Sequence, residues 1–182
     1  MQMIIKRMRK FCVYVAVAII ALGCTTPAHA EWEVASKVAE TVTQTAFVDD
    51  GYTAKEYSAE VFKLVNKART EAGLSALTGL KTLEPLAYIR AKESSVQFSH
   101  KRPDGRSCAT VYSDSGQRYR YAGENLSYGF KEPSALVEAW MNSKSHRVNL
   151  LGSDYLSAEV GYYITESGTI YCSMLFYTAK TA

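Results

Sequence analysis

The sequence predicts a layered α+β domain in which helices pack on two sides of a small antiparallel sheet. Apolar residues recur at helical spacing in the first two thirds of the chain, whereas the C-terminal part alternates between apolar and polar positions. The length of 182 residues suits one domain with some extra chain. Hydrophobic residues make up 47% and charged residues 21%, which is typical of a packed globular protein.

The N-terminus has the layout of a secretory signal peptide at residues 1–30. A basic segment precedes an apolar run at residues 11–23, and Ala28-His29-Ala30 is a small-x-small cleavage site. The run is shorter than the roughly 20 apolar residues of a transmembrane helix. We therefore expect secretion, with no transmembrane span in the mature chain. Two alternatives stay open: an uncleaved anchor, and a lipoprotein formed through Cys24.

The charge of the chain is unevenly distributed. The formal net charge is +3, but four of the 21 basic residues lie in the first ten positions and all 18 acidic residues follow residue 30. Without the signal the chain is close to neutral. This balance argues against a nucleic-acid partner.

The domain is expected to span residues 54–180, behind a leader or linker at residues 31–53. Its first helix begins after Thr53, which forms a capping box with Glu56, and it ends near Gly73.

A second helix is predicted for residues 82–98, with Pro85 tolerated in its first turn. Several residues of its inward stripe are small, so another element can approach closely. The stripe comprises Leu83, Leu86, Ala87, Arg90, Ala91, Ser94 and Phe98.

Residues 102–105 form a predicted turn, and residues 106–120 a loop. A short strand or extended segment follows at residues 121–129. Pro133 begins a third helix that ends at Asn142, and residues 143–151 form a short fourth helix.

The C-terminus is predicted to be a β-hairpin. Residues 158–165 and 170–177 alternate in polarity around a turn at Glu166-Ser167-Gly168. The second strand is apolar or aromatic on both faces except at Ser173, so we expect it to be the more central one.

Cysteine usage predicts one disulfide. Cys12 and Cys24 belong to the signal, which leaves Cys108 and Cys172 in an oxidising compartment. A buried free thiol at Cys172 is the alternative. A further alternative is that Cys108 acts as a nucleophile with His100 or His146 as its base.

Three polar residues are candidates for a site. Once His29 leaves with the signal, His100 and His146 are the histidines of the domain, and each by itself could be a surface or capping residue. Glu124 stands in an apolar segment, where a buried carboxylate needs partners. The motifs of zinc proteases, serine hydrolases, P-loop proteins and dinucleotide-binding proteins are absent from the sequence.

Four motifs in order make the chain resemble the CAP superfamily. Also called SCP-like, it comprises cysteine-rich secretory proteins, antigen 5 and pathogenesis-related 1 proteins, and the secreted bacterial branch is the most similar. The motifs are FSHKRPDG at residues 98–105, GENL at 123–126, AWMNS and SHRVNLL within 139–151, and EVGYY at 159–163. The resemblance covers about residues 54–178.

The resemblance implies a three-layer α-β-α sandwich with a central cleft. In many members the cleft holds two histidines and two acidic residues, sometimes with a divalent metal. His100 and Glu124 match one histidine and one glutamate of this set. Ser143 stands where many eukaryotic members have the second glutamate, and His146 belongs to a bacterial segment. The set is incomplete, so we expect at most a weak divalent-metal site, for example for zinc, at His100, His146 and Glu124.

The sequence therefore predicts an extracellular binding module. Its cleft would hold a small, lipid-like or cell-envelope ligand or a protein partner, and the 13 tyrosines of the chain supply amphipathic contact surface. Five basic residues could attract anionic groups or simply form a solvated surface: Lys101, Arg102, Arg106, Arg118 and Arg120. If His100 and Glu124 are in contact, as their place in the family motifs implies, that contact could also be purely structural.

The alternative function is an extracellular hydrolase, either a divalent-metal-dependent or a Cys-His peptidase. The sequence shows no defined nucleophile and no oxyanion hole for it.

Overall fold

The computed structural model of the protein describes residues 52–181. The predicted signal peptide, the leader up to residue 51 and the lipidation alternative at Cys24 lie outside the described residues. Within the described range, none of the helices is both long enough and apolar enough to span a membrane.

The centre of the domain is a four-stranded sheet with the order β1-β3-β4-β2. Strand β4 (Ile170–Ala179) pairs antiparallel with β2 (Tyr119–Tyr128) on one side and with β3 (Ser157–Ile164) on the other. The two-residue β1 (Thr78–Gly79) pairs with β3 in parallel. The predicted hairpin is confirmed as β3 and β4, with Gly168 at φ 82° in its turn. Because β4 lies between β3 and β2, the prediction that it is the more central strand is also confirmed.

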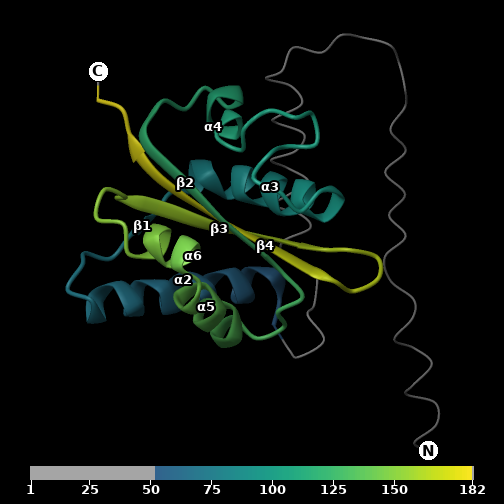
Figure 1. The fold of residues 1–182 in the computed structure, drawn as a ribbon, viewed down its shortest axis with the longest axis horizontal. Coiled ribbons are helices and arrows are strands. Elements are labelled where there is room, and N and C mark those ends of the chain that lie inside the picture. The colour runs from purple at the N-terminus through teal and green to yellow at the C-terminus, as the bar shows by residue number, and fades with distance from the viewer. Residues whose placement is uncertain (1–51, 182) are drawn as a thin grey trace, which may run out of the picture.

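Helices cover both faces of the sheet (Figure 1). One face packs against α3 (Glu84–Val96) and the short α4 (Thr110–Asp114), and the other against α2 (Ala54–Glu71), α5 (Pro133–Asn142) and α6 (Lys144–Leu150). This is the three-layer α-β-α sandwich that the sequence resemblance implies.

Local sequence signals account for where several helices begin. The Thr53 hydroxyl accepts a hydrogen bond from the Glu56 backbone amide at 3.2 Å, and the Glu56 carboxylate accepts one from the Thr53 amide at 2.8 Å. This is the predicted capping box at the start of α2. Proline in the first turn opens both α3 and α5, where a missing backbone N–H costs nothing.

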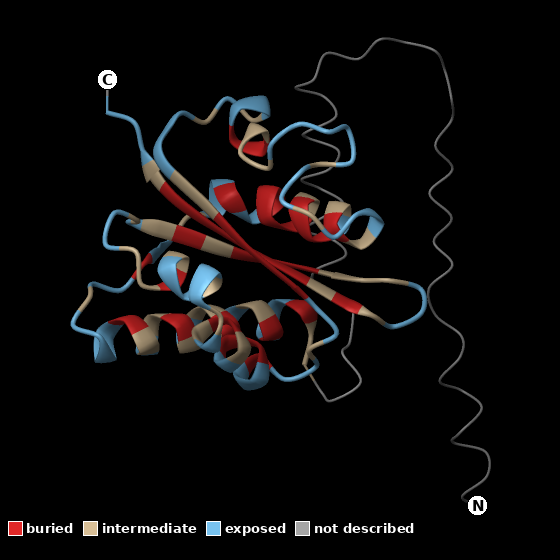
Figure 2. Ribbon diagram, in the orientation of Figure 1, coloured by how far each residue is buried: buried red, intermediate tan, exposed pale blue. Residues whose placement is uncertain are grey.

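Two separate hydrophobic cores lie on the two faces of the sheet (Figure 2). The larger core joins α2 and α5 to β3 and β4, and it contains Tyr57, Trp140 and Cys172. The smaller core joins α3 and α4 to β4, and it contains Leu86 and Leu175. Neighbouring residues of β4 therefore belong to different cores, as the alternation of a strand requires.

The small residues of the second helix allow the close approach that the sequence predicts. Gly161 of β3 lies so near α3 that a side chain at this position would collide with the backbone of Ala87 and Tyr88. Of the predicted stripe, Leu83, Leu86, Ala87, Arg90, Ala91 and Ser94 are buried, and Phe98 at the end is half exposed.

Three local predictions are corrected by the structure. Residues 106–120 are not a continuous loop, because they include α4 and the start of β2. The short strand expected at 121–129 is a ten-residue strand that begins at Tyr119. The second helix begins at Glu84 after a 3-10 turn at Lys81–Leu83, and it ends at Val96.

Candidate functional site

A buried ion pair holds Glu124 on the α3 face of the sheet. Arg90 of α3 donates from Nε to Glu124 Oε2 at 2.6 Å and from Nη2 to Oε1 at 3.2 Å. The Arg90 side chain is wholly buried and that of Glu124 is 2% exposed. Glu124 therefore has the partner that a buried carboxylate needs. That partner is Arg90, which the sequence analysis placed on the inward stripe of the second helix without pairing it with Glu124.

His100 contacts the same carboxylate. The residue follows α3, and its Nδ1 lies 2.8 Å from Glu124 Oε1. Burial acts to raise the pKa of Glu124, but hydrogen bonds from His100 and Arg90 outweigh it and hold that pKa below its ordinary range. Glu124 is thus an ionised carboxylate shared by an arginine and a histidine.

Cys108 is the third member of this group. A sulfur atom of Cys108, a ring nitrogen of His100 and a carboxylate oxygen of Glu124 lie within 4.8 Å of one another. The Cys108 backbone amide also donates to the His100 carbonyl at 2.9 Å, which fixes the two residues side by side. The hydrogen bonds of His100 with Cys108 and then with Glu124 raise the pKa of His100 to about 9.

The predicted disulfide between Cys108 and Cys172 is not formed in this structure, in which both residues are free thiols. Cys172 is fully buried in the core on the α2 and α5 face. Cys108 lies beside Glu124, whose neighbour across the strands is Leu175 of the other core. The sheet itself separates the two sulfur atoms, so the buried free thiol at Cys172, the alternative in the sequence analysis, is the one observed.

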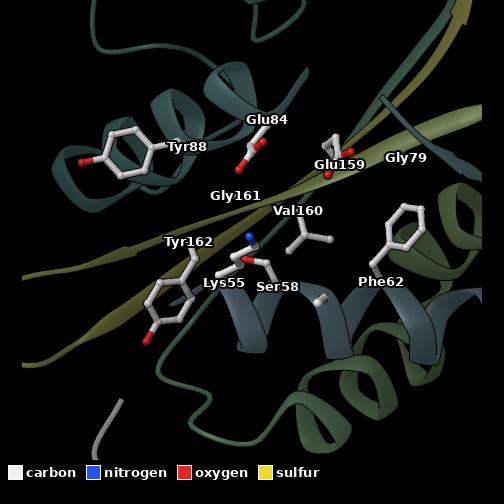
Figure 3. Close-up of a pocket in the computed structure, with 11 residues that line it drawn as sticks. Lys55, Ser58, Phe62, Gly79, Glu84, Tyr88, Glu159, Val160, Gly161 and Tyr162 are labelled. Atoms are coloured by element: carbon white, nitrogen blue, oxygen red, sulfur yellow. The ribbon is translucent and has the colours of Figure 1, made fainter. Parts of the chain in front are cut away.

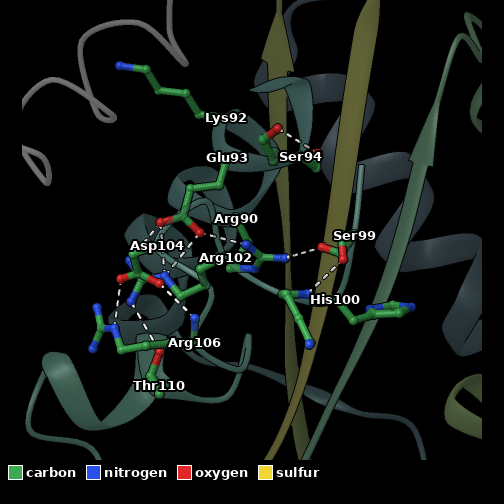
Figure 4. Close-up of polar contacts among 12 residues, drawn as sticks. Arg90, Lys92, Glu93, Ser94, Ser99, His100, Arg102, Asp104, Arg106 and Thr110 are labelled. Atoms are coloured by element: carbon green, nitrogen blue, oxygen red, sulfur yellow. Dashed lines mark hydrogen bonds and ion pairs between the residues drawn. The ribbon is translucent and has the colours of Figure 1, made fainter. Parts of the chain in front are cut away.

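Ion pairs hold the loop after His100 (Figure 4). Glu93 of α3 accepts hydrogen bonds from Arg90 at 2.6 Å and from Arg102 at 2.6 Å, and Arg102 also reaches Asp114 of α4 at 2.6 Å. Arg106 donates to Asp114 at 2.9 Å and to a nearby aspartate of its own loop. The positive charges of Arg102 and Arg106 are therefore neutralised internally, which leaves them little attraction for an outside anion.

His146 and Ser143 line a cleft at the outer edge of β2. The cleft has a volume of about 260 Å³. Its lining residues are Phe98, Leu126, Ser127, Tyr128, Phe130, Ala139, Trp140, Ser143 and His146. The His146 ring lies 6.4 Å from that of Trp140, measured between ring centres.

The charge of His100 acts on His146. Burial, and then the positive charge of His100, lower the pKa of His146. No hydrogen bond joins His146 to His100 or Glu124 in the part of the chain described here. The structure thus brings His100 and Glu124 into contact and places His146 nearby, on the side of the aromatic cleft.

Side chains of the α5–α6 region cover the outer edge of β2. Trp140 donates to the Leu126 carbonyl at 3.2 Å, and Asn149 donates to the Glu124 carbonyl at 3.1 Å. Asn125 in turn donates to the carbonyl of His146 at 3.1 Å. These contacts fix α6 against the strand that carries Glu124. The sequence analysis did not single out Asn125 or Asn149, although both stand inside the motifs it used.

The predicted metal set does not fit a divalent cation well. His146 does not reach the contact between His100 and Glu124, and both carboxylate oxygens of Glu124 already bind Arg90. Cys108 replaces His146 as the third donor near these two residues. Any cation there would compete with the buried guanidinium for the carboxylate, so we assign no metal role to this group.

A second cavity lies at the opposite edge of the sheet, where α2 and α3 approach β3 (Figure 3). Its volume is about 300 Å³. Its lining includes Phe62, Tyr88 and two carboxylates, Glu84 and Glu159. Burial, and then the nearby charge of Glu84, raise the pKa of Glu159. The sequence analysis did not predict this cavity, because its walls come from four separate segments.

Two curated relatives from Bacillus subtilis share sequence with the chain. It is 34% identical over 150 residues to the uncharacterized protein YkwD, which covers 81% of this chain and 58% of that protein. It is 30% identical over 104 residues to the uncharacterized membrane protein YlbC, covering 56% of this chain and 30% of that protein. The chain thus spans less than two thirds of the length of each.

Solved structures share the fold. An extracellular protein containing an SCP domain from Bacillus anthracis has a TM-score of 0.61 at 24% identity, over 66% of this chain and 40% of that one. An outer surface protein from Borrelia burgdorferi has a TM-score of 0.65 at 23% identity, over 71% of this chain and 97% of that one. The family model described as the cysteine-rich secretory protein family matches residues 62–176, which confirms the sequence resemblance. The chain therefore belongs to this family, the CAP family.

Proposed function

We propose that this protein is a secreted binding module that holds an amphipathic cell-envelope ligand in the cleft beside β2. The main observation in support of this proposal is a row of aromatic rings at the mouth of that cleft. Phe98 and Tyr128 are 51% and 54% exposed, and their ring centres are 4.8 Å apart. Tyr171 stacks on Tyr128 at 5.7 Å.

Exposed aromatic side chains that contact one another are costly to keep in water and mark binding surfaces. Rings of this kind stack against apolar faces of sugars and acyl chains, while the tyrosine hydroxyls remain hydrated. The row continues inward to Trp140, Ser143 and His146, which line the cleft. A ligand could therefore place an apolar part on the row and a polar part near His146.

The size of the cleft favours an extended ligand. At about 260 Å³ it is slightly smaller than the ~300–1,000 Å³ typical of pockets that enclose a whole small molecule. Part of the ligand would then lie outside it, along Tyr128 and Tyr171. Glycan strands and lipids of a cell envelope have this extended, amphipathic character.

Secretion is supported by the predicted signal peptide and by relatives that are described as extracellular or outer-surface proteins. The family description and the names of the relatives assign no hydrolytic activity. The comparisons therefore do not favour the hydrolase alternative, although the free Cys108 thiol beside His100 is the pair of residues that a Cys-His peptidase would need.

Co-sedimentation of the secreted protein with two envelope preparations tests the proposal. One preparation is purified peptidoglycan, and the other is vesicles of anionic phospholipid. The double variant Phe98→Ala, Tyr128→Ala should weaken retention by about tenfold, because aromatic anchors commonly contribute 1–2 kcal/mol or more to binding.

Leu156→Ala is the matched control, since Leu156 is 63% exposed and lies outside the lining of the cleft. It should leave retention unchanged. Retention by one preparation alone identifies the class of ligand. Failure of both preparations to retain the wild-type protein, or equal retention of the double variant, contradicts the proposal.

A further inference from the structure

Cys108 combines three properties that its role in the fold does not require. It is partly exposed, it has no disulfide partner, and it lies within 4.8 Å of the His100 and Glu124 side chains. The second cysteine of the described chain is fully buried beyond the sheet and cannot reach it. An accessible thiol without an internal partner will meet external disulfides if the chain is exported as predicted.

We propose that Cys108, with His100 and Glu124, is a thiol-exchange site that forms a mixed disulfide with a low-molecular-weight disulfide. This goes beyond the proposed binding function, and it involves a different group of residues from the aromatic cleft.

The arrangement supplies what a reactive thiol needs. A cysteine reacts as its thiolate, and an adjacent imidazolium favours that form. His100 is tied to Cys108 by the backbone hydrogen bond of 2.9 Å, and its Nδ1 is oriented by the Glu124 carboxylate at 2.8 Å. Glu124 cannot rotate away, because Arg90 holds both of its oxygens from inside the core. Glu124 and Arg90 are thus positioning residues for the imidazole.

The site is open on the side of the imidazole. The His100 side chain is 59% exposed, whereas that of Glu124 is 2% exposed. A reagent therefore reaches the sulfur past the histidine ring, not through the core. The partial burial of Cys108 favours a small disulfide over a folded protein surface.

The reaction is a thiol–disulfide exchange, so it involves no net oxidation or reduction. When the Cys108 thiol loses its proton, the imidazolium of His100 lies beside the sulfur and stabilises the thiolate that forms. The Cys108 thiolate attacks one sulfur of a disulfide R–S–S–R, the original S–S bond breaks, and a Cys108–S–S–R bond forms. The departing R–S⁻ takes a proton from His100, because the capped sulfur no longer stabilises the imidazolium.

The experiment measures the rate of mixed-disulfide formation on the reduced, secreted protein at pH 7. Oxidised glutathione and cystamine serve as probes of opposite charge, and mass spectrometry of intact protein and peptides locates the adduct. We expect one adduct per folded chain, located on Cys108. Cys172 should react only after unfolding, so Cys172→Ala should still form the adduct.

His100→Gln should slow the reaction by about tenfold or more with both probes, because the neutral amide cannot stabilise the attacking thiolate by charge. Lys101→Gln is the matched control, because it removes a neighbouring exposed positive charge without touching the group. Its effect should be small and should have opposite sign for the two probes. The unfolded chains of all variants should react at one rate.

Three results would overturn the proposal. The first is a folded wild-type protein whose Cys108 reacts no faster than in the unfolded chain, a comparison that needs no variant. The second is an unchanged rate in folded His100→Gln. The third is a Cys108–Cys172 bridge in the secreted protein. None of these affects the binding proposal, which is tested on Phe98 and Tyr128.

Discussion

Arg90 on α3 and Glu124 on β2 form an ion pair of 2.6 Å from which water is excluded. The arginine is wholly buried, and the glutamate brings His100 into the same hydrogen-bonded group. Because the charges compensate each other in the core, each depends on the other for its burial. This pair joins the helix layer to the edge strand and positions the polar part of the candidate site.

Replacing Arg90 with Met should lower the free energy of unfolding by about 3–5 kcal/mol, because Glu124 would remain buried without its main partner. Urea denaturation at pH 7 measures this loss. Adding Glu124→Gln to Arg90→Met should recover part of it by removing the uncompensated charge. Lys63→Met is the control, because Lys63 and Glu60 form an exposed i,i+3 pair that should contribute about 0–1 kcal/mol. Equal losses in Arg90→Met and Lys63→Met would contradict the buried-pair interpretation.

The two histidines should change stability with pH in opposite directions. The pKa of His100 is raised from 6.5 to about 9, so its contribution is complete below pH 6.5 and is lost as the pH rises towards 9. The pKa of His146 is lowered from 6.5, so its contribution is present above that pH and is lost as the pH falls below it.

Melting temperatures measured from pH 5 to about pH 10 for the wild type, His100→Gln and His146→Gln check these signs. His100→Gln should flatten the alkaline side of the profile, and His146→Gln should flatten the acid side. If both variants flatten the same side of the pH profile, the direction of the pKa shift assigned to one of the two histidines is incorrect.

Glu159→Gln should stabilise the protein at neutral pH. Burial, and then the charge of Glu84, raise the pKa of Glu159 above its ordinary value of 4.5, so the folded state disfavours the ionised form. This group therefore favours folding below pH 4.5 and opposes it as the pH rises through its folded-state pKa. The neutral amide avoids that cost. Chemical denaturation should show the gain at pH 7 and its disappearance at pH 4, whereas a loss of stability at both pH values would contradict it.

Gly161→Ala should destabilise the domain by about 2–3 kcal/mol, because the added Cβ would collide with the α3 backbone at Ala87 and Tyr88. A helix backbone cannot move aside without shifting the whole layer. Gly79→Ala is a matched substitution whose Cβ would meet only the end of the Glu159 side chain, at 3.0 Å. Thermal unfolding should therefore show a clearly smaller loss for Gly79→Ala, and equal losses would argue against the close helix–sheet contact.

The sequence by itself determined the features that depend on neighbouring residues. The capping box of Thr53 and Glu56, the proline that opens α5 and the alternation in β3 and β4 act over a few residues, so they can be recognised without the fold. The order of the four motifs identified the family and hence the sandwich. Contact between His100 and Glu124 was also expected from those motifs.

The tertiary structure alone decided which residues surround that contact. Burial of Arg90 could be predicted from the helix stripe, but its pairing with Glu124 depends on how α3 lies across β2. The short α4 and β1 were not predicted, because elements of five and two residues carry little local signal. The cysteine composition allowed a disulfide between Cys108 and Cys172, but in the folded protein the sheet lies between the two residues. Which face of a sheet a loop folds over is set by packing between segments that are distant in sequence, and no local pattern records it.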